Sequence, residues 1–255
     1  MAGSFKTWPA CLASDVRMTV PDLDSAGRFL AANGRPRGAR YDGYADWYDE
    51  RLSDFTASAT AYIFELLGDL AGRCLDLGCG GGVHLPAFRE RGWSPVGVDL
   101  SVDQLRVARM RAPDVWLVRA DGAALPFADR AFDAVVAAFV HTDLDDLAGT
   151  VREAARVLRP GGRFVHVGTH PCFVGPFSSY PGPDPPVLHP GYRDMGWTMD
   201  APGFGDGLRR RVGVHHVPLA ELLNAVATAG LAVERALEPA GLDYPKVFAL
   251  SARRP

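Results

Sequence analysis

The chain has 255 residues, of which 47% are hydrophobic and 22% are charged, and its formal net charge is −3. This length suffices for the core of one α/β domain, or of two smaller ones, and the composition is that of a globular protein. Because no basic surface, long apolar run or leader pattern is present, we expect no nucleic-acid partner, no membrane span and no secretion, which favours a cytoplasmic protein.

The N-terminal part of the chain divides into an extension and a helical segment. Prolines and glycines interrupt residues 1–40, which we interpret as an N-terminal extension with one short helix at 24–32. Residues 41–70 have the apolar spacing of helices, and Ser53 and Asp54 are the expected point of division.

Strands and helices alternate from residue 73 onward. Strands are predicted near 73–77, 94–99, 115–119, 132–138 and 163–169, and helices near 83–91, 101–111 and 144–158. Asp143 is the expected N-cap of the last of these helices, and Gly161-Gly162 predicts a turn before the fifth strand. A helix at 218–229 and strands near 231–237 and 246–252 follow. This alternation predicts an α/β fold with a parallel sheet and helices on both faces.

Residues 171–217 interrupt the alternation with many prolines, glycines and aromatic residues. A structureless connection of this length is uncommon in a compact domain, and its aromatic content is too high for disorder. It follows the carboxyl end of a strand, where open α/β sheets bind ligands. We interpret the segment as a substrate lid, with a decorative insertion or an oligomer contact as alternatives. Its basic cluster, 209–211, is expected to lie in a solvated loop.

The most informative local pattern is the glycine-rich turn after the first strand of this alternation. Residues 75–82 read Leu-Asp-Leu-Gly-Cys-Gly-Gly-Gly, and Asp99 ends the next predicted strand. Glycines let a ligand approach the backbone, the following helix offers its first N–H groups, and the carboxylate can accept hydrogen bonds from ribose hydroxyls. The pattern therefore predicts a site for an adenosine-containing cofactor.

The spacing and the charge favour one class of cofactor. Gly78 and Gly80 fit the dinucleotide fingerprint, but its sixth position is Val83 rather than glycine. Asp76 precedes the turn, where a carboxylate would repel a pyrophosphate and attract an ammonium group. S-adenosylmethionine (SAM) has an ammonium, a sulfonium and no phosphate, so the pattern favours SAM and makes a nicotinamide dehydrogenase a distant alternative.

Four segments together resemble a known family. Residues 75–101 resemble motifs I and II of the class I SAM-dependent methyltransferases, in the small-molecule branch that includes the ubiquinone/menaquinone-type enzymes. Residues 121–127, 132–136 and 153–162 resemble later segments of that family, and the likeness covers about residues 41–170. It implies a Rossmann-like, seven-stranded, mostly parallel sheet with an antiparallel last strand beside the fifth, an N-terminal helical cap and one domain at 41–255.

The resemblance also implies which residues bind SAM. Asp76 and the glycines would line its methionine end, Asp99 its ribose and Asp121 its adenine. His84 could equally be a plain helix residue, and the two tyrosines could equally be core packing. The implied cofactor-binding set is Tyr41, Tyr48, Asp76, Gly78, Cys79, Gly80, His84, Asp99, Leu100, Gln104, Asp121, Gly122, Ala123, Phe139 and Val140.

The candidate general bases follow from position alone. His141 and His170 leave the fourth and fifth predicted strands at the edge where ligands bind, which makes them the catalytic candidates. His166 lies inside the fifth strand and is expected to be a satisfied interior residue. Of His215 and His216, at most one can face a substrate. We see no metal-ligand set, and the four cysteines have no paired spacing, so reduced thiols are expected.

These patterns predict methyl transfer from SAM to an oxygen or nitrogen of a small apolar or aromatic metabolite, such as a product of secondary metabolism. The alternatives are an RNA or protein methyltransferase and a SAM-binding protein without methyl transfer. The expected partner is a small molecule, and the chain is expected to be a monomer or homodimer.

Overall fold

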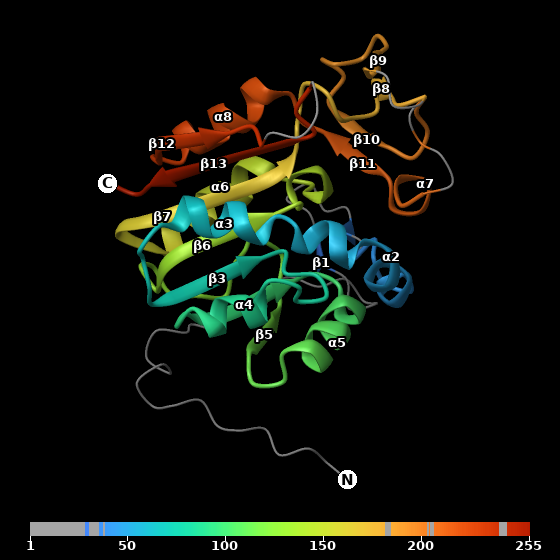
Figure 1. Ribbon diagram of the computed structural model, residues 1–255. Coiled ribbons are helices and arrows are strands. Elements are labelled where there is room, and N and C mark those ends of the chain that lie inside the picture. Colours follow the sequence, from blue (N-terminus) through green and yellow to red (C-terminus); the bar gives the residue numbers. More distant parts are fainter. Residues whose placement is uncertain are drawn as a thin grey trace.

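The computed structural model describes residues 29–30, 36–37, 39–181, 185–202, 204, 207–239 and 244–255. Its centre is a seven-stranded sheet with the order β12-β13-β7-β6-β3-β4-β5 (Figure 1). The strands are β3 (Arg73–Leu77), β4 (Ser94–Asp99), β5 (Trp116–Arg119), β6 (Phe132–Ala138), β7 (Leu158–Thr169), β12 (Ala232–Leu237) and β13 (Val247–Arg253). Strand β13 pairs antiparallel with β7 and β12, whereas β3 to β7 are parallel, so the predicted sheet and its antiparallel last strand are confirmed.

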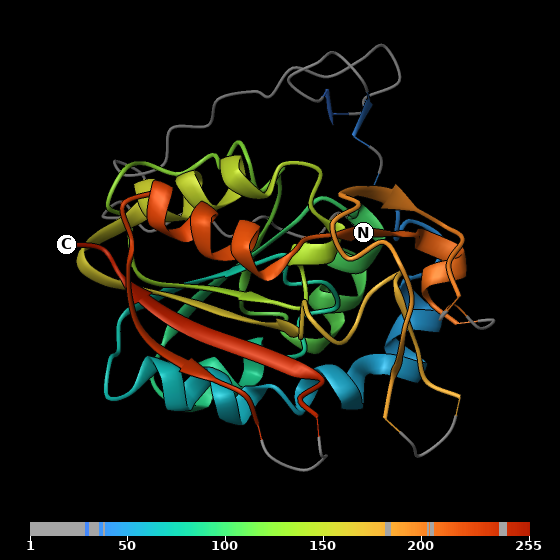
Figure 2. The ribbon, with the colours of Figure 1, turned by 90° about the horizontal axis from the view of Figure 1, so that it is seen from above.

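Helices cover both faces of this sheet, as predicted (Figure 2). One apolar cluster joins one face to α3 (Thr60–Leu67) and α4 (Leu85–Glu90) through side chains such as Ile63 and Phe88. A second cluster joins the other face to α6 (Leu147–Val157) and α8 (Leu219–Thr228) through side chains such as Val151 and Leu222. Two further helices, α2 (Ala45–Ala57) and α5 (Val102–Arg111), contact each other, and α5 also contacts β4 and β5.

Two local predictions near the N-terminus are wrong. The helical segment divides at residues 58–59, after α2, rather than at Ser53 and Asp54. The Thr56 hydroxyl donates to the Leu52 carbonyl and competes with the helical hydrogen bonds there, which favours the later end. The expected helix at 24–32 is contradicted at Phe29–Leu30, which forms strand β1 paired antiparallel with β2 (Pro36–Arg37). The rest of that helix lies outside the described residues.

Two predictions near β7 need correction. Asp146, not Asp143, caps α6, because its Oδ1 accepts a hydrogen bond from the Gly149 N–H at 2.7 Å. Asp143 instead ends a short 3-10 helix, η1 (His141–Asp143). The expected turn at 161–162 lies within β7, where the pairing with β6 shifts from Leu158 to Arg163. Residues 159–162 of β7 lie opposite a single residue of β6, so an irregular stretch inside the strand takes the place of a separate turn.

The described residues of the segment 171–217 follow β7 and lie past the carboxyl edge of the sheet (Figure 1). The described part contains β8 (Ser178–Ser179), β9 (Val187–Leu188), β10 (Gly196–Thr198), α7 (Arg209–Val212) and β11 (Val214–His216). Strands β10 and β11 pair antiparallel, and β11 contacts η1. The basic cluster forms α7 rather than a solvated loop, and the Arg209 side chain is only 23% exposed because it pairs with Asp143.

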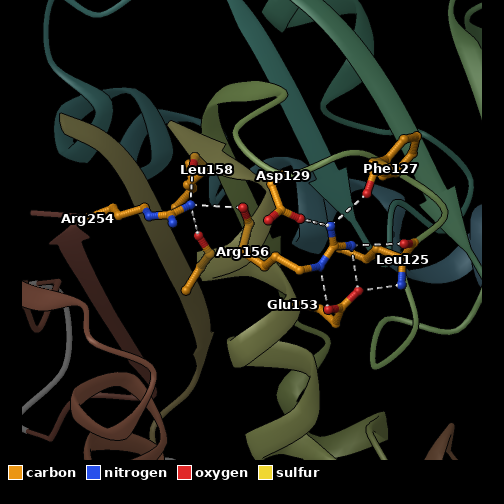
Figure 3. Close-up of polar contacts among 8 residues, drawn as sticks. Leu125, Phe127, Asp129, Glu153, Arg156, Leu158 and Arg254 are labelled. Atoms are coloured by element: carbon orange, nitrogen blue, oxygen red, sulfur yellow. Dashed lines mark hydrogen bonds and ion pairs between the residues drawn. The ribbon is translucent and has the colours of Figure 1, made fainter. Parts of the chain in front are cut away.

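Arg156 of α6 connects this helix to the loop before β6 (Figure 3). Its guanidinium donates to Glu153, Asp129 and the carbonyls of Leu125 and Phe127. We expect Arg156→Met to lower the free energy of unfolding by about 2 kcal/mol, because these acceptors lose a shared, partly buried charged donor. Arg152→Met, which changes an exposed arginine of the same helix, should stay within about 0.5 kcal/mol of the wild type. Urea unfolding of both variants measures the difference, and equal effects would contradict the prediction.

Candidate functional site

A cavity lies at the carboxyl edge of the sheet, above the ends of β3, β4, β5 and β6. The space between its lining atoms is about 1120 Å³, part of it open to solvent. Its lining residues are 39–41, 48, 56, 77–81, 83–84, 98–101, 104, 120, 122, 138–140 and 143–145. The cavity thus lies where open α/β sheets bind their ligands.

The glycine-rich loop forms one wall of this cavity. The N–H groups of Gly78 and Cys79 both donate to the Val98 carbonyl, at 2.8 and 2.9 Å, which folds the loop back over β4. Gly78 has φ +71°, and a Cβ atom on it would lie 2.4 Å from Val140 Cγ2. Only glycine allows this backbone conformation together with such close packing.

Asp99 lies opposite the loop and holds it in place. Its Oδ2 accepts from the Gly80 N–H at 2.9 Å and its Oδ1 from the Ser101 N–H at 2.8 Å. Burial raises the pKa of Asp99 to about 6, against the effect of these two hydrogen bonds. The carboxylate lines the cavity and keeps further lone pairs for a ligand's hydroxyl groups.

Two buried oxygen atoms beside the cavity have no hydrogen-bond partner among the described residues, Asp76 Oδ2 and Gln104 Oε1. Gln104 lines the cavity, whereas Asp76 lies behind the lining, one residue before Leu77. Burial and the nearby charge of Asp99 raise the pKa of Asp76 to about 7. Unpartnered acceptors and two carboxyls fit a ligand with an ammonium group and hydroxyls, and they do not fit a pyrophosphate.

The structure brings most of the implied cofactor residues together. Twelve of the fifteen line the cavity, and the exceptions are Asp76, Asp121 and Ala123. Asp121 accepts a hydrogen bond from the Ala123 N–H at 2.9 Å, and this turn presents Gly122 to the cavity.

Aromatic side chains form another part of the lining, which we call the aromatic wall. Tyr41 and Tyr48 pack edge to face with ring centroids 5.5 Å apart, and burial raises the pKa of both hydroxyls. Phe139 adopts φ +54°, an unfavourable conformation for a bulky residue, and packs 4.9 Å from the exposed ring of Phe55. Backbone strain of this kind concentrates at functional sites.

Neither catalytic candidate lines the cavity. His141 is buried against His166 with ring centroids 4.9 Å apart, and burial lowers the pKa of both imidazoles, that of His166 to about 4. His166 Nε2 has no described partner, so this histidine is interior, as predicted, but not satisfied. His170 is also buried; its Nδ1 accepts from the Cys172 N–H, and its Nε2 lies 2.8 Å from Glu238.

One histidine does line the cavity. His84 is 3% exposed, its Nδ1 lies 3.0 Å from the Thr60 hydroxyl, and its Nε2 has no partner among the described residues. Burial lowers the pKa of His84 to about 4, so the ring is neutral near pH 7. When Nδ1 accepts from Thr60, Nε2 carries the hydrogen and can donate to a ligand oxygen.

Sequence reasoning missed a group of charged side chains at one end of the cavity. Arg209 donates to Asp143 Oδ1 at 2.6 Å and to the Thr142 hydroxyl at 2.9 Å. Arg40 pairs with Asp145, which also lies 3.3 Å from His215 Nε2. The acidic run at 143–146 and the basic run at 209–211 were visible signals, but no spacing rule links residues so far apart.

Comparisons with known proteins identify related sequences. Residues 75–166 match the methyltransferase domain family. A demethylmenaquinone methyltransferase of Renibacterium salmoninarum is 33% identical over 145 residues, which cover 54% of this chain and 61% of the relative. A ubiquinone biosynthesis O-methyltransferase of Alkalilimnicola ehrlichii is 32% identical over 160 residues, 58% of this chain and 64% of the relative. The chain thus spans less than two thirds of the length of these relatives.

A related structure matches more of the chain. The crystal structure of a SAM-dependent methyltransferase from Mesorhizobium loti has a TM-score of 0.67 and 27% identity, and the match covers 79% of this chain and 100% of that one. The described residues contain neither a helix long and apolar enough to cross a membrane nor a cluster of metal-binding side chains.

Proposed function

The chain contains a class I SAM-dependent methyltransferase domain, and on this premise we propose that the protein transfers the methyl group of SAM to an oxygen or nitrogen atom of a small apolar or aromatic molecule. The relatives named for demethylmenaquinone and for ubiquinone biosynthesis support a quinone-like aromatic acceptor. The single observation that carries the proposal is the cavity, in which a glycine-rich loop, Asp99 and unpartnered acceptors meet beside an aromatic wall.

The proposed roles follow from the geometry of the lining. Gly78 and Gly80 would let the amino-acid end of SAM approach the backbone, and His84 Nε2 would donate to its carboxylate. Asp99 would accept from the ribose hydroxyls, and Gly122 would lie beside the adenine. When bound, SAM supplies an activated methyl group, and the protein contributes orientation and the exclusion of water.

The aromatic wall and residues 171–217 would enclose the acceptor. Tyr41, Tyr48 and Phe139 line the cavity, which supports an apolar acceptor and a role of α2 as a cap. The proposed lid does not itself line the cavity, but its Arg209 and His215 contact the lining residues Asp143 and Asp145. We therefore keep 41–255 as one domain with a lid at 171–217.

An RNA or protein methyltransferase is the alternative with a larger substrate. Among the described lining residues the one cation is Arg40, which is paired with Asp145. A cation that is already paired attracts phosphate groups only weakly. Methyl incorporation into bulk tRNA or protein would favour this alternative over a small acceptor. A protein that binds SAM without transfer would release no S-adenosylhomocysteine with any acceptor.

Calorimetric titration tests the cofactor first. We expect SAM and S-adenosylhomocysteine to bind the full chain and NADH not to bind. Arg40, the cation among the described lining residues, is already paired with Asp145, and the carboxyls of Asp99 and of Asp76 behind it would repel a pyrophosphate. Labelled SAM with hydroquinones and naphthols should then release S-adenosylhomocysteine and yield a methylated product. Binding of NADH without binding of SAM would contradict the proposal.

A further inference from the structure

Four charged side chains form a neutral group at one end of the cavity. Arg40 and Arg209 are cationic, Asp143 and Asp145 are anionic, and their side chains are between 14% and 27% exposed. Arg40 also donates to the Asp143 carbonyl at 3.0 Å, which joins the two ion pairs. Because each of these four charges has a partner of opposite sign, the group is polar but carries no net charge.

Asp143 is the member of the group best placed to contact a second ligand. It lines the cavity, follows β6 and lies near Tyr41, whose hydroxyl has its pKa raised by burial and by the charge of Asp143. Arg209 does not line the cavity; it approaches from behind, through Asp143 Oδ1 and the Thr142 hydroxyl. A carboxylate accepts up to four hydrogen bonds, so these partners leave Asp143 able to accept one more.

We propose that Asp143 binds the hydroxyl of an uncharged aromatic acceptor and that Arg209 is the positioning residue that holds and neutralises it. The inference rests on the proposed function, because that function places the acceptor in this cavity. In the cavity lining, a cationic acceptor would meet Arg40, and an anionic acceptor would meet Asp143 and Asp145. A neutral hydrogen-bond donor is repelled neither by the arginine nor by the aspartates. The group therefore selects hydroxylated aromatic compounds.

Three naphthalene probes that differ in one substituent test this selection. 2-Naphthol is neutral near pH 7, 2-naphthoate is an anion and 2-(aminomethyl)naphthalene is a cation. Their fluorescence is titrated with full-length protein saturated with S-adenosylhomocysteine. The wild type should bind 2-naphthol at least about tenfold more tightly than either charged probe.

Two single substitutions should shift this preference in opposite directions. Arg209→Met leaves the Asp143 carboxylate without its partner. The affinity for the cationic probe should therefore rise about tenfold relative to the affinity for 2-naphthol. Asp143→Asn leaves the charge of Arg209 without its partner. The affinity for the anionic probe should therefore rise about tenfold relative to the affinity for 2-naphthol. A merely structural role for the pair would weaken all three probes alike. Arg210→Met is the matched control, because the neighbouring Arg210 is exposed and pairs with exposed Asp200.

The double variant Asp143→Asn with Arg209→Met keeps the test decisive if a single variant does not fold. It leaves neither charge unpaired, and it should lose the preference for 2-naphthol without gaining one for a charged probe. Unchanged preferences in every Asp143 and Arg209 variant, or no preference for 2-naphthol in the wild type, would overturn the inference. Failure of the proposed function is separate, since it shows as SAM binding without methyl transfer to any acceptor.

Discussion

Replacing Gly78 with alanine is expected to lower the free energy of unfolding by about 3 kcal/mol and to remove detectable SAM binding. The added Cβ would lie 2.4 Å from Val140 Cγ2 and 3.0 Å from Val140 Cβ, and the backbone has φ +71°. The left-handed conformation costs about 1–2 kcal/mol for an L-residue, and overpacking adds about 1–3 kcal/mol. Relief of the clash would move the loop that lines the cavity, so binding is lost with stability.

Gly92→Ala separates these two contributions. Gly92 has φ +81°, but a Cβ atom there meets nothing within 4 Å, so this variant should lose only about 1–2 kcal/mol and keep SAM binding. Adding Val140→Ala to Gly78→Ala removes the closest contact and should restore part of the stability. Urea unfolding and SAM titration measure all three variants. A Gly78 variant that behaves like the Gly92 variant would show that close packing against Val140 does not matter.

The affinity for SAM is expected to fall about 100-fold between pH 7.5 and pH 5.5. Asp76 and Asp99 have pKa values raised to about 7 and about 6 in the ligand-free protein, so both take up protons as the pH falls through this range. Binding of an ammonium group and of ribose hydroxyls favours the ionised carboxylates. For each of the two carboxyls, the affinity for SAM therefore falls about tenfold with each pH unit below the raised pKa of that carboxyl.

Substitution of each carboxyl should remove a different part of the profile. Asp76→Asn should remove the loss of affinity that begins near pH 7, and Asp99→Asn should remove the loss that begins near pH 6. Both substitutions should also weaken SAM binding at pH 7.5. Calorimetry at pH 7 in two buffers of different ionisation enthalpy should detect proton release by the wild type that Asp76→Asn reduces. An affinity that does not change with pH in the wild type would exclude both carboxyls from the site.

The sheet and the cofactor loop could be predicted because their signals are local. Apolar runs between glycine turns predicted the positions of all seven strands of the sheet, and the family resemblance supplied the antiparallel last strand. Glycine at residue 78 reflects a backbone conformation that few other residues adopt, so the turn was visible in the sequence. Helix ends were less predictable, because Asp143 and Asp146 are equally good caps by residue type, and only the path of the chain selects between them.

The sequence by itself therefore determined the α/β architecture and the location and charge of the cofactor turn. Only the tertiary structure decided which polar groups meet across the cavity: it buried His141 against His166, turned His170 toward Glu238 and brought Arg209 to Asp143. Periodicity reports which face of a helix or strand is apolar, a property of neighbouring residues. The pairing of two charges from distant loops depends instead on how those loops cross the sheet edge, which no local pattern records.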